Sequence, residues 1–138
     1  MIVADTGAVV ALVDADDRHH ATFVRLFEAD PDAWVLPWAI LPEVDYLLDR
    51  HVGPEAARAF LADVAAGAFT VEWGAPEDLA RAHELGAQYA GLRLGLVDGV
   101  VAAVAERLRA TGIATLDLRD FGALRLRGAP RLLPRDAA

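Results

Sequence analysis

The sequence predicts an α/β fold in which helices cover both faces of a central, mostly parallel sheet of four to five strands. Short β-rich apolar runs alternate along the chain with longer runs of helical periodicity. Gly, Pro and Asp clusters separate these runs. Strands that alternate with helices indicate βαβ units, whose parallel strands are buried on both faces.

Length and composition set the bounds of this prediction. The chain has 138 residues, 55% hydrophobic and 25% charged, which predicts one folded domain over residues 1–138 and excludes a disordered chain. No apolar run approaches the roughly 20 residues of a membrane span. The start lacks the basic region of a signal peptide, so we expect a cytoplasmic protein with no membrane partner.

Residue usage excludes several chemistries. The chain has no cysteine, which excludes disulfides and thiolate metal sites. All its basic side chains are arginines, which excludes a lysine nucleophile and a P-loop. The net charge of −8 argues against a polyanionic partner. From Asp117 onward, however, five arginines face three acids, and this tail could contact phosphates, contact an acidic partner, or be solvated surface.

The first half of the chain predicts, in order, a strand at residues 2–4, a helix at 8–13, a helix at 18–29, a strand at 34–36 and a helix at 39–51. Pro37 ends the second strand. Apolar residues recur in the last helix at i, i+4, i+7 and i+8, as one stripe: Ile40, Val44, Leu47 and Leu48.

The second half predicts a helix at 55–66, a strand at 69–73, helices at 76–91 and 97–109, a strand at 113–116, a helical turn around Phe121 and a fifth strand at 132–133. The helix at 76–91 is expected to turn four residues inward: Leu79, Ala82, His83 and Leu85. The helix at 97–109 has no charge from 100 to 105, so it is expected to be buried on several sides. The three tryptophans are interpreted as core residues: Trp34, Trp38 and Trp73.

Four carboxylates are predicted where strands turn into helices: Asp5, Glu43, Asp98 and Asp117. Such turns lie at the carboxyl edge of a parallel sheet, where ligands of these folds bind. Like charges packed together need a cation, so the pattern favours a divalent-metal site. The four histidines, by contrast, show no metal-ligand spacing.

Each of these acids also has a structural interpretation that stays open. Asp5 suits a helix N-cap, and Glu43 suits the first turn of a helix beside solvent. Asp98 heads the most apolar helix, where burial of an unpaired carboxylate is costly. Asp117 can cap a turn, and Thr115, two residues earlier on the same strand face, can support a carboxylate.

In four segments, taken in order and spacing, the chain resembles a PIN domain, specifically a VapC-type toxin of a bacterial toxin–antitoxin pair. The segments are Ile-Val-Ala-Asp-Thr-Gly-Ala at 2–8, Leu-Pro-Glu-Val at 41–44, Leu-Val-Asp-Gly-Val-Val-Ala-Ala-Val-Ala at 96–105 and Thr-Leu-Asp-Leu-Arg-Asp-Phe at 115–121. The similarity covers nearly the whole chain. One departure is Gly99, where an alanine is more usual.

The resemblance implies a three-layer α/β/α sandwich and an endoribonuclease, a hydrolase that depends on Mg²⁺ or Mn²⁺. It implies that Asp5, Glu43, Asp98 and Asp117 form the catalytic and metal-binding site, with Asp5 and Asp98 as direct ligands. Thr6 and Thr115 match supporting positions. It further implies an RNA substrate, a homodimer and an antitoxin whose tail occupies the site.

Two alternatives to a ribonuclease remain. The same acidic cluster could serve a DNA-directed nuclease, because only the resemblance favours RNA. The chain could also be a catalytically silent interaction module that retains the fold.

Overall fold

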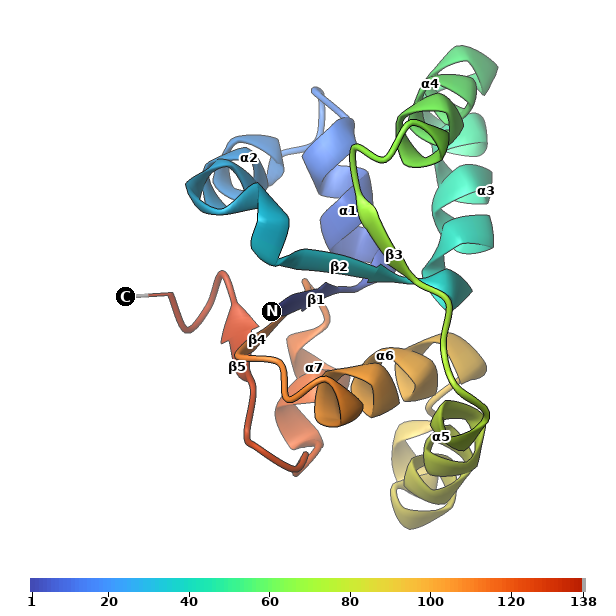
Figure 1. Ribbon diagram of the computed structural model, residues 1–138, viewed down its shortest axis with the longest axis vertical. Helices are drawn as coiled ribbons and strands as arrows, with labels where there is room; N and C mark the ends of the chain where they lie inside the picture. The colour runs from blue at the N-terminus through green and yellow to red at the C-terminus, as the bar shows by residue number, and fades with distance from the viewer. Residues whose placement is uncertain (138) are drawn as a thin grey trace.

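In the computed structural model, which describes residues 1–137, five short strands form one parallel sheet in the order β3-β2-β1-β4-β5 (Figure 1). The strands are β1 (Ile2–Ala4), β2 (Trp34–Pro37), β3 (Thr70–Glu72), β4 (Gly112–Ala114) and β5 (Arg131–Leu133). The expected parallel sheet is confirmed, with β1 at its centre.

Helices lie on both sides of this sheet. The α-helices are α1 (Thr6–Val13), α2 (His20–Ala29), α3 (Leu41–His51), α4 (Pro54–Ala65), α5 (Pro76–Gln88), α6 (Leu96–Arg107) and α7 (Leu118–Ala123). Short 3₁₀ turns are η1 (Pro31–Ala33), η2 (Trp38–Ile40) and η3 (Ala90–Leu92). Figure 1 shows α1 to α4 above the sheet and α5 to α7 below it, so the three-layer α/β/α arrangement is confirmed.

The core follows the hydrophobic pattern of the sequence. In β1, Val3 and Ala4 are fully buried, as the central strand of a parallel sheet requires. Helix α6 is buried without interruption from Gly99 to Glu106, which confirms the expectation for the most apolar helix. No helix within residues 1–137 is long and apolar enough to cross a membrane.

The expected inner face of α5 was partly wrong. Leu79 is 49% exposed and His83 is also exposed, whereas Leu85 is fully buried. The inward position is instead taken by Asp78, at 2% exposure. Arg107 of α6 forms two hydrogen bonds with this carboxylate, of 2.7 and 3.0 Å, so a charged residue replaces the expected apolar one.

The expectation that all three tryptophans belong to the core was also partly wrong. Trp34 is 1% exposed, and Trp38 packs against the core, but Trp73 is 74% exposed. Trp73 directly follows the edge strand β3 and precedes Gly74, whose φ is +91°. The chain therefore leaves the sheet before the indole can be covered.

One of the four acids does not follow a strand. Asp98 lies in the first turn of α6, which follows α5 and η3, so the expected strand-to-helix turn was wrong there. Because α6 leads into β4, it runs back along the sheet and begins at the carboxyl edge. Asp98 therefore reaches the same edge from a helical hairpin.

Candidate active site

The four acids predicted from the sequence come together at the carboxyl edge of the sheet. They line one open hollow of about 510 Å³, together with a threonine, a glycine and two leucines: Asp5, Thr6, Gly7, Glu43, Leu47, Asp98, Leu116 and Asp117. Residues more than 100 positions apart in the sequence are thus neighbours. The hollow joins the ends of β1 and β4 to the starts of α3 and α6.

Asp5 is the most firmly held of these acids. It is 6% exposed and caps α1, where Oδ1 accepts a 2.8 Å hydrogen bond from the Thr6 N–H. Its Oδ2 accepts a 2.9 Å bond from the Thr115 hydroxyl, which itself accepts a 2.9 Å bond from the Asp117 N–H. The Thr115 hydroxyl thus accepts one hydrogen bond, from Asp117, and donates its single proton to Asp5. Asp5 therefore caps α1 and also lines the hollow with a carboxylate of fixed orientation.

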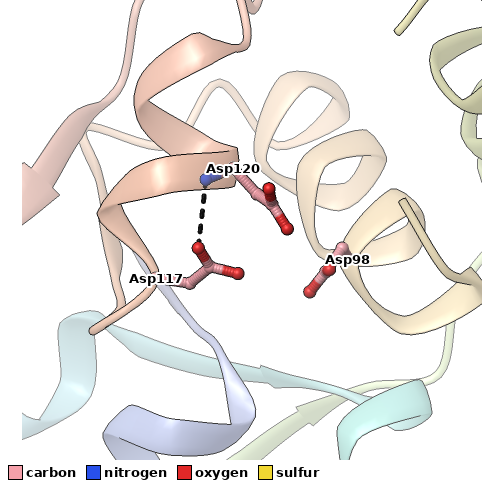
Figure 2. Close-up of side chains that lie close together, drawn as sticks. All are labelled: Asp98, Asp117 and Asp120. Atoms are coloured by element: carbon pink, nitrogen blue, oxygen red, sulfur yellow. Dashed lines mark hydrogen bonds between the residues drawn. The ribbon is translucent and has the colours of Figure 1, made fainter. Parts of the chain in front are cut away.

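A closer group of carboxylates lies beside Asp5. Figure 2 shows Asp98 from α6 facing Asp117 and Asp120 from the start of α7. One carboxylate oxygen from each lies within 4.8 Å of the others. The Asp120 N–H donates a 3.0 Å bond to Asp117 Oδ1, which fixes Asp117 as the cap of α7.

The electrostatics of the hollow disfavour negative charge. Burial raises the pKa of Asp98 to about 7, and the neighbouring charges of Asp5 and Asp117 add to the shift. Burial also raises the pKa of Asp5, although the hydrogen bonds from Thr6 and Thr115 oppose this. The site would hold all its charges more easily with a cation present.

Glu43 lies at the rim of the hollow. It is in the first turn of α3, where the chain has just left β2 through η2, and its side chain is exposed. Pro42 occupies the first turn of the same helix, as its sequence position predicts. A carboxylate so placed can meet a substrate from the solvent side.

Asp120 was not among the predicted site residues. Its sequence signal is its spacing from Asp117, because residues three apart on a helix lie on one face. The sequence predicted only a helical turn around Phe121. Without a predicted helix, the spacing from Asp117 did not identify Asp120 as a site residue.

The residues of the hollow fit a hard divalent cation. Carboxylate oxygens are the ligands that Mg²⁺ and Mn²⁺ prefer, and several converge here from separate elements. Thr6 adds a further sign, because its hydroxyl is buried and has no hydrogen-bond partner among residues 1–137. An unpaired buried hydroxyl costs about 1–3 kcal/mol, which a further ligand in the hollow would offset.

The family model of the PIN domain matches residues 2–125. The chain therefore belongs to the PIN domain family.

Two relatives from Mycobacterium tuberculosis are similar over almost their full length. The ribonuclease VapC26 is 32% identical over 130 residues, which are 94% of this chain and 96% of VapC26. The crystal structure of VapC20, a toxin that cleaves the sarcin–ricin loop, superposes with a TM-score of 0.81 at 26% identity, over 93% of this chain and 98% of VapC20. A third structure, VapBC2 from Rickettsia felis bound to a promoter DNA fragment, supports the fold alone, with a TM-score of 0.69 at 18% identity over 96% of this chain and 97% of that one.

Proposed function

We propose that this protein is a metal-dependent endoribonuclease that hydrolyses RNA phosphodiester bonds and acts as the toxin of a toxin–antitoxin pair. The observation that carries the proposal is the convergence of Asp5, Glu43, Asp98 and Asp117 in one hollow. The similarity to the ribonuclease VapC26 favours RNA over DNA as the substrate. The intact set of acids argues against a silent interaction module.

The proposed roles follow from how each acid is held. Asp5 and Asp98 would be direct ligands of Mg²⁺ or Mn²⁺, Asp5 because Thr6 and Thr115 fix its carboxylate. Asp117 and Asp120 would complete the ligand set from the start of α7. The bound cation would supply Lewis-acid activation and offset the charge of the phosphate under attack.

Glu43 has a different proposed role. It is exposed at the rim, where it can orient the attacking water and accept its proton on a carboxylate oxygen. Leu47, one turn further along α3, and Leu116 border the hollow and would limit access of bulk water.

A cleavage assay tests the nuclease proposal. Total RNA, and single-stranded DNA in parallel, are incubated with the wild-type protein in magnesium, manganese or excess chelator, and with Asp98→Asn in magnesium. We expect RNA cleavage only by the wild-type protein with metal. Cleavage of RNA at an unchanged rate in chelator or by Asp98→Asn would refute the site, and cleavage of DNA instead would reassign the substrate.

The toxin role includes a protein partner and a second copy. A protein of similar fold belongs to a toxin–antitoxin complex from Klebsiella pneumoniae, and we propose likewise a cognate antitoxin, a homodimer and a cytoplasmic location for this chain. Expression alone should arrest bacterial growth, and co-expression of the short gene directly upstream should relieve the arrest. Normal growth on expression of a protein that cuts RNA in vitro would remove the toxin role and leave the nuclease.

A further inference from the structure

The C-terminal part of the chain carries positive charge that the proposed chemistry does not use. From Asp117 onward there are five arginines and three acids, in a chain of net charge −8. Two of these acids, Asp117 and Asp120, lie in the carboxylate group of the candidate site. When a cation engages them, Asp136 is the one acid left to balance the arginines in this part of the sequence.

A hollow of about 290 Å³ lies in this region, between α7, the loop after it and β5. We call it the α7 groove; its walls include Phe121, Leu126 and Leu132, with Arg125 and Arg135 at its sides. Arg135 reaches across to α7, since its Nη1 lies 3.7 Å from where a Cβ on Gly122 would stand. The groove therefore combines an apolar floor with guanidinium groups.

Arg125 and Arg135 line the α7 groove, and Arg119 lies on α7 outside this lining; the three differ in how far carboxylates neutralise them. Arg135 donates two bonds to Asp136, of 2.7 and 3.0 Å. Arg119 and Arg125 are exposed, and neither has a carboxylate partner within residues 1–137. Unpaired guanidinium groups on a groove can bind phosphate oxygens.

The position of Arg125 is fixed by its backbone. Its N–H donates a 3.1 Å bond to the Tyr89 hydroxyl, which ties the loop after α7 to the turn before α6. The neighbouring Leu124 N–H donates to the Phe121 carbonyl, 3.3 Å away. Arg125 is thus presented from an anchored loop.

Helix α7 connects the candidate site, which Asp117 lines, to the α7 groove, which Phe121 and Gly122 line. Helix α7 starts directly after Asp117, contains Arg119 in its first turn and is followed by Arg125. Six helical residues span roughly 9 Å, so a strand that leaves the site along α7 would reach Arg125 within a few nucleotides.

We propose that Arg119, Arg125 and the α7 groove bind the phosphate backbone of single-stranded RNA next to the scissile bond. This inference rests on the proposed ribonuclease function and adds the path of its substrate. The contacts are to phosphates, so they give affinity without sequence preference. The apolar floor of the groove can also hold a base.

The test measures RNA binding against salt concentration in a chain that cannot cut. A short, mixed-sequence, fluorescently labelled single-stranded RNA is titrated with full-length Asp98→Asn and with the same variant carrying Arg119→Gln and Arg125→Gln. We expect several-fold weaker binding and a slope of log affinity against log salt that is smaller by roughly 0.7 for each arginine. Arg25→Gln with Arg58→Gln, two exposed arginines on α2 and α4, should leave the slope unchanged.

The outcomes separate this inference from the proposed function. Equal slopes for the α7 variant and the control, while the wild-type protein cuts RNA, would overturn the groove and leave the nuclease. Loss of slope in the α7 variant, while the wild-type protein cuts no RNA, would support the groove and overturn the nuclease. If the α7 variant weakens binding of the antitoxin but not of RNA, the groove belongs to a protein partner and the RNA path is wrong.

Discussion

Asp5 and Asp98 face the same hollow but hold their charges in different ways. Asp5 has two hydrogen-bond donors, which stabilise its ionised form against burial. For Asp98, burial and neighbouring acids all act in one direction, toward protonation. In the metal-free protein, Asp98 is therefore the acid that gains most from a cation.

The raised pKa of Asp98 predicts how stability depends on pH. Its pKa is about 7 in the folded chain, and the unfolded value is about 3.9. The folded state then binds more protons than the unfolded state between these values, so the free energy of unfolding falls as pH rises from about 4 to about 7. Asp98→Asn should flatten this dependence, which urea unfolding in chelator at several pH values would measure. A wild-type curve as flat as the Asn curve would contradict it.

Removal of the Asp120 carboxylate should weaken metal binding. Its carboxylate completes the group with Asp98 and Asp117, so Asp120→Asn should weaken Mn²⁺ binding by about tenfold or more, as measured by calorimetry. Asp49→Asn, an exposed acid of α3, is the matched control and should bind Mn²⁺ like the wild-type protein. Equal affinities of the two variants would place Asp120 outside the metal site.

At the residue scale, the sequence predicts the acids better than their surroundings. Asp5, Glu43 and Asp117 could be found because strand ends are visible as apolar runs closed by turn residues. The sequence could not show that the Thr115 hydroxyl is hydrogen-bonded and the Thr6 hydroxyl is not. The Thr115–Asp5 bond joins residues 110 positions apart, and the lack of a partner for Thr6 depends on packing. The proposed roles of all these residues stay predictions.

At the scale of elements, the pairing of α5 with α6 decides where Asp98 lies. Gly99 meets α5 so closely that an added Cβ would stand 2.8 Å from the Cβ of Ala82. This contact gives a physical reason for glycine at position 99, where the family resemblance led us to expect alanine. The two helices could be predicted separately, but their close approach depends on distant residues.

Gly99→Ala should therefore destabilise the protein, although alanine favours a helix by up to about 1 kcal/mol. Overpacking costs about 1–3 kcal/mol, so we expect a net loss of about 1 kcal/mol in the free energy of unfolding. Adding Ala82→Gly removes the clash and should restore stability beyond the sum of the single effects. A double-mutant cycle by chemical denaturation measures this coupling, and additive effects would contradict the close contact.

An ion pair also holds α5 against α6. Arg107 of α6 donates to Asp78 of α5 and, over 2.8 Å, to Glu72 at the end of β3. Arg107→Met would remove the ionic partner of the buried Asp78 carboxylate and leave it the hydrogen bond from the Ala75 N–H, at a cost of about 2 kcal/mol after allowance for the partial exposure of Arg107. Thermal unfolding would measure the loss. Arg135→Met, which breaks an exposed pair, is the control and should not change the midpoint.

On the scale of the whole molecule, the alternation of strands and helices was sufficient to predict the layers. Sheet order was not predicted, because order depends on which strands pair and not on local pattern. The assignment of residues 1–138 to one domain stays a prediction. Exposed apolar side chains likewise have no sequence signal, since Leu79 and Leu96 look like core residues but are 49% and 57% exposed.

The exposure of Leu79 and Leu96 predicts that they lie at the interface of the proposed homodimer. They line a mostly apolar hollow of about 430 Å³ between α5 and the start of α6. If the proposed homodimer forms there, Leu79→Asp with Leu96→Asp should convert a dimer to a monomer, as measured by light scattering. Leu61→Asp, at a leucine of α4 that is 63% exposed, is the control and should leave the mass unchanged. A dimer that survives the first pair of changes would place its interface elsewhere.

The central position of β1 has a consequence for how the protein is made. β1 is synthesised well before its partner β4, and well before Thr115 and the acids of α7. A nascent chain therefore cannot close the middle of its sheet, or gather its carboxylates, until β4 and the start of α7 have left the ribosome. As the proposed ribonuclease, the chain would have a complete active site only from that point of its synthesis.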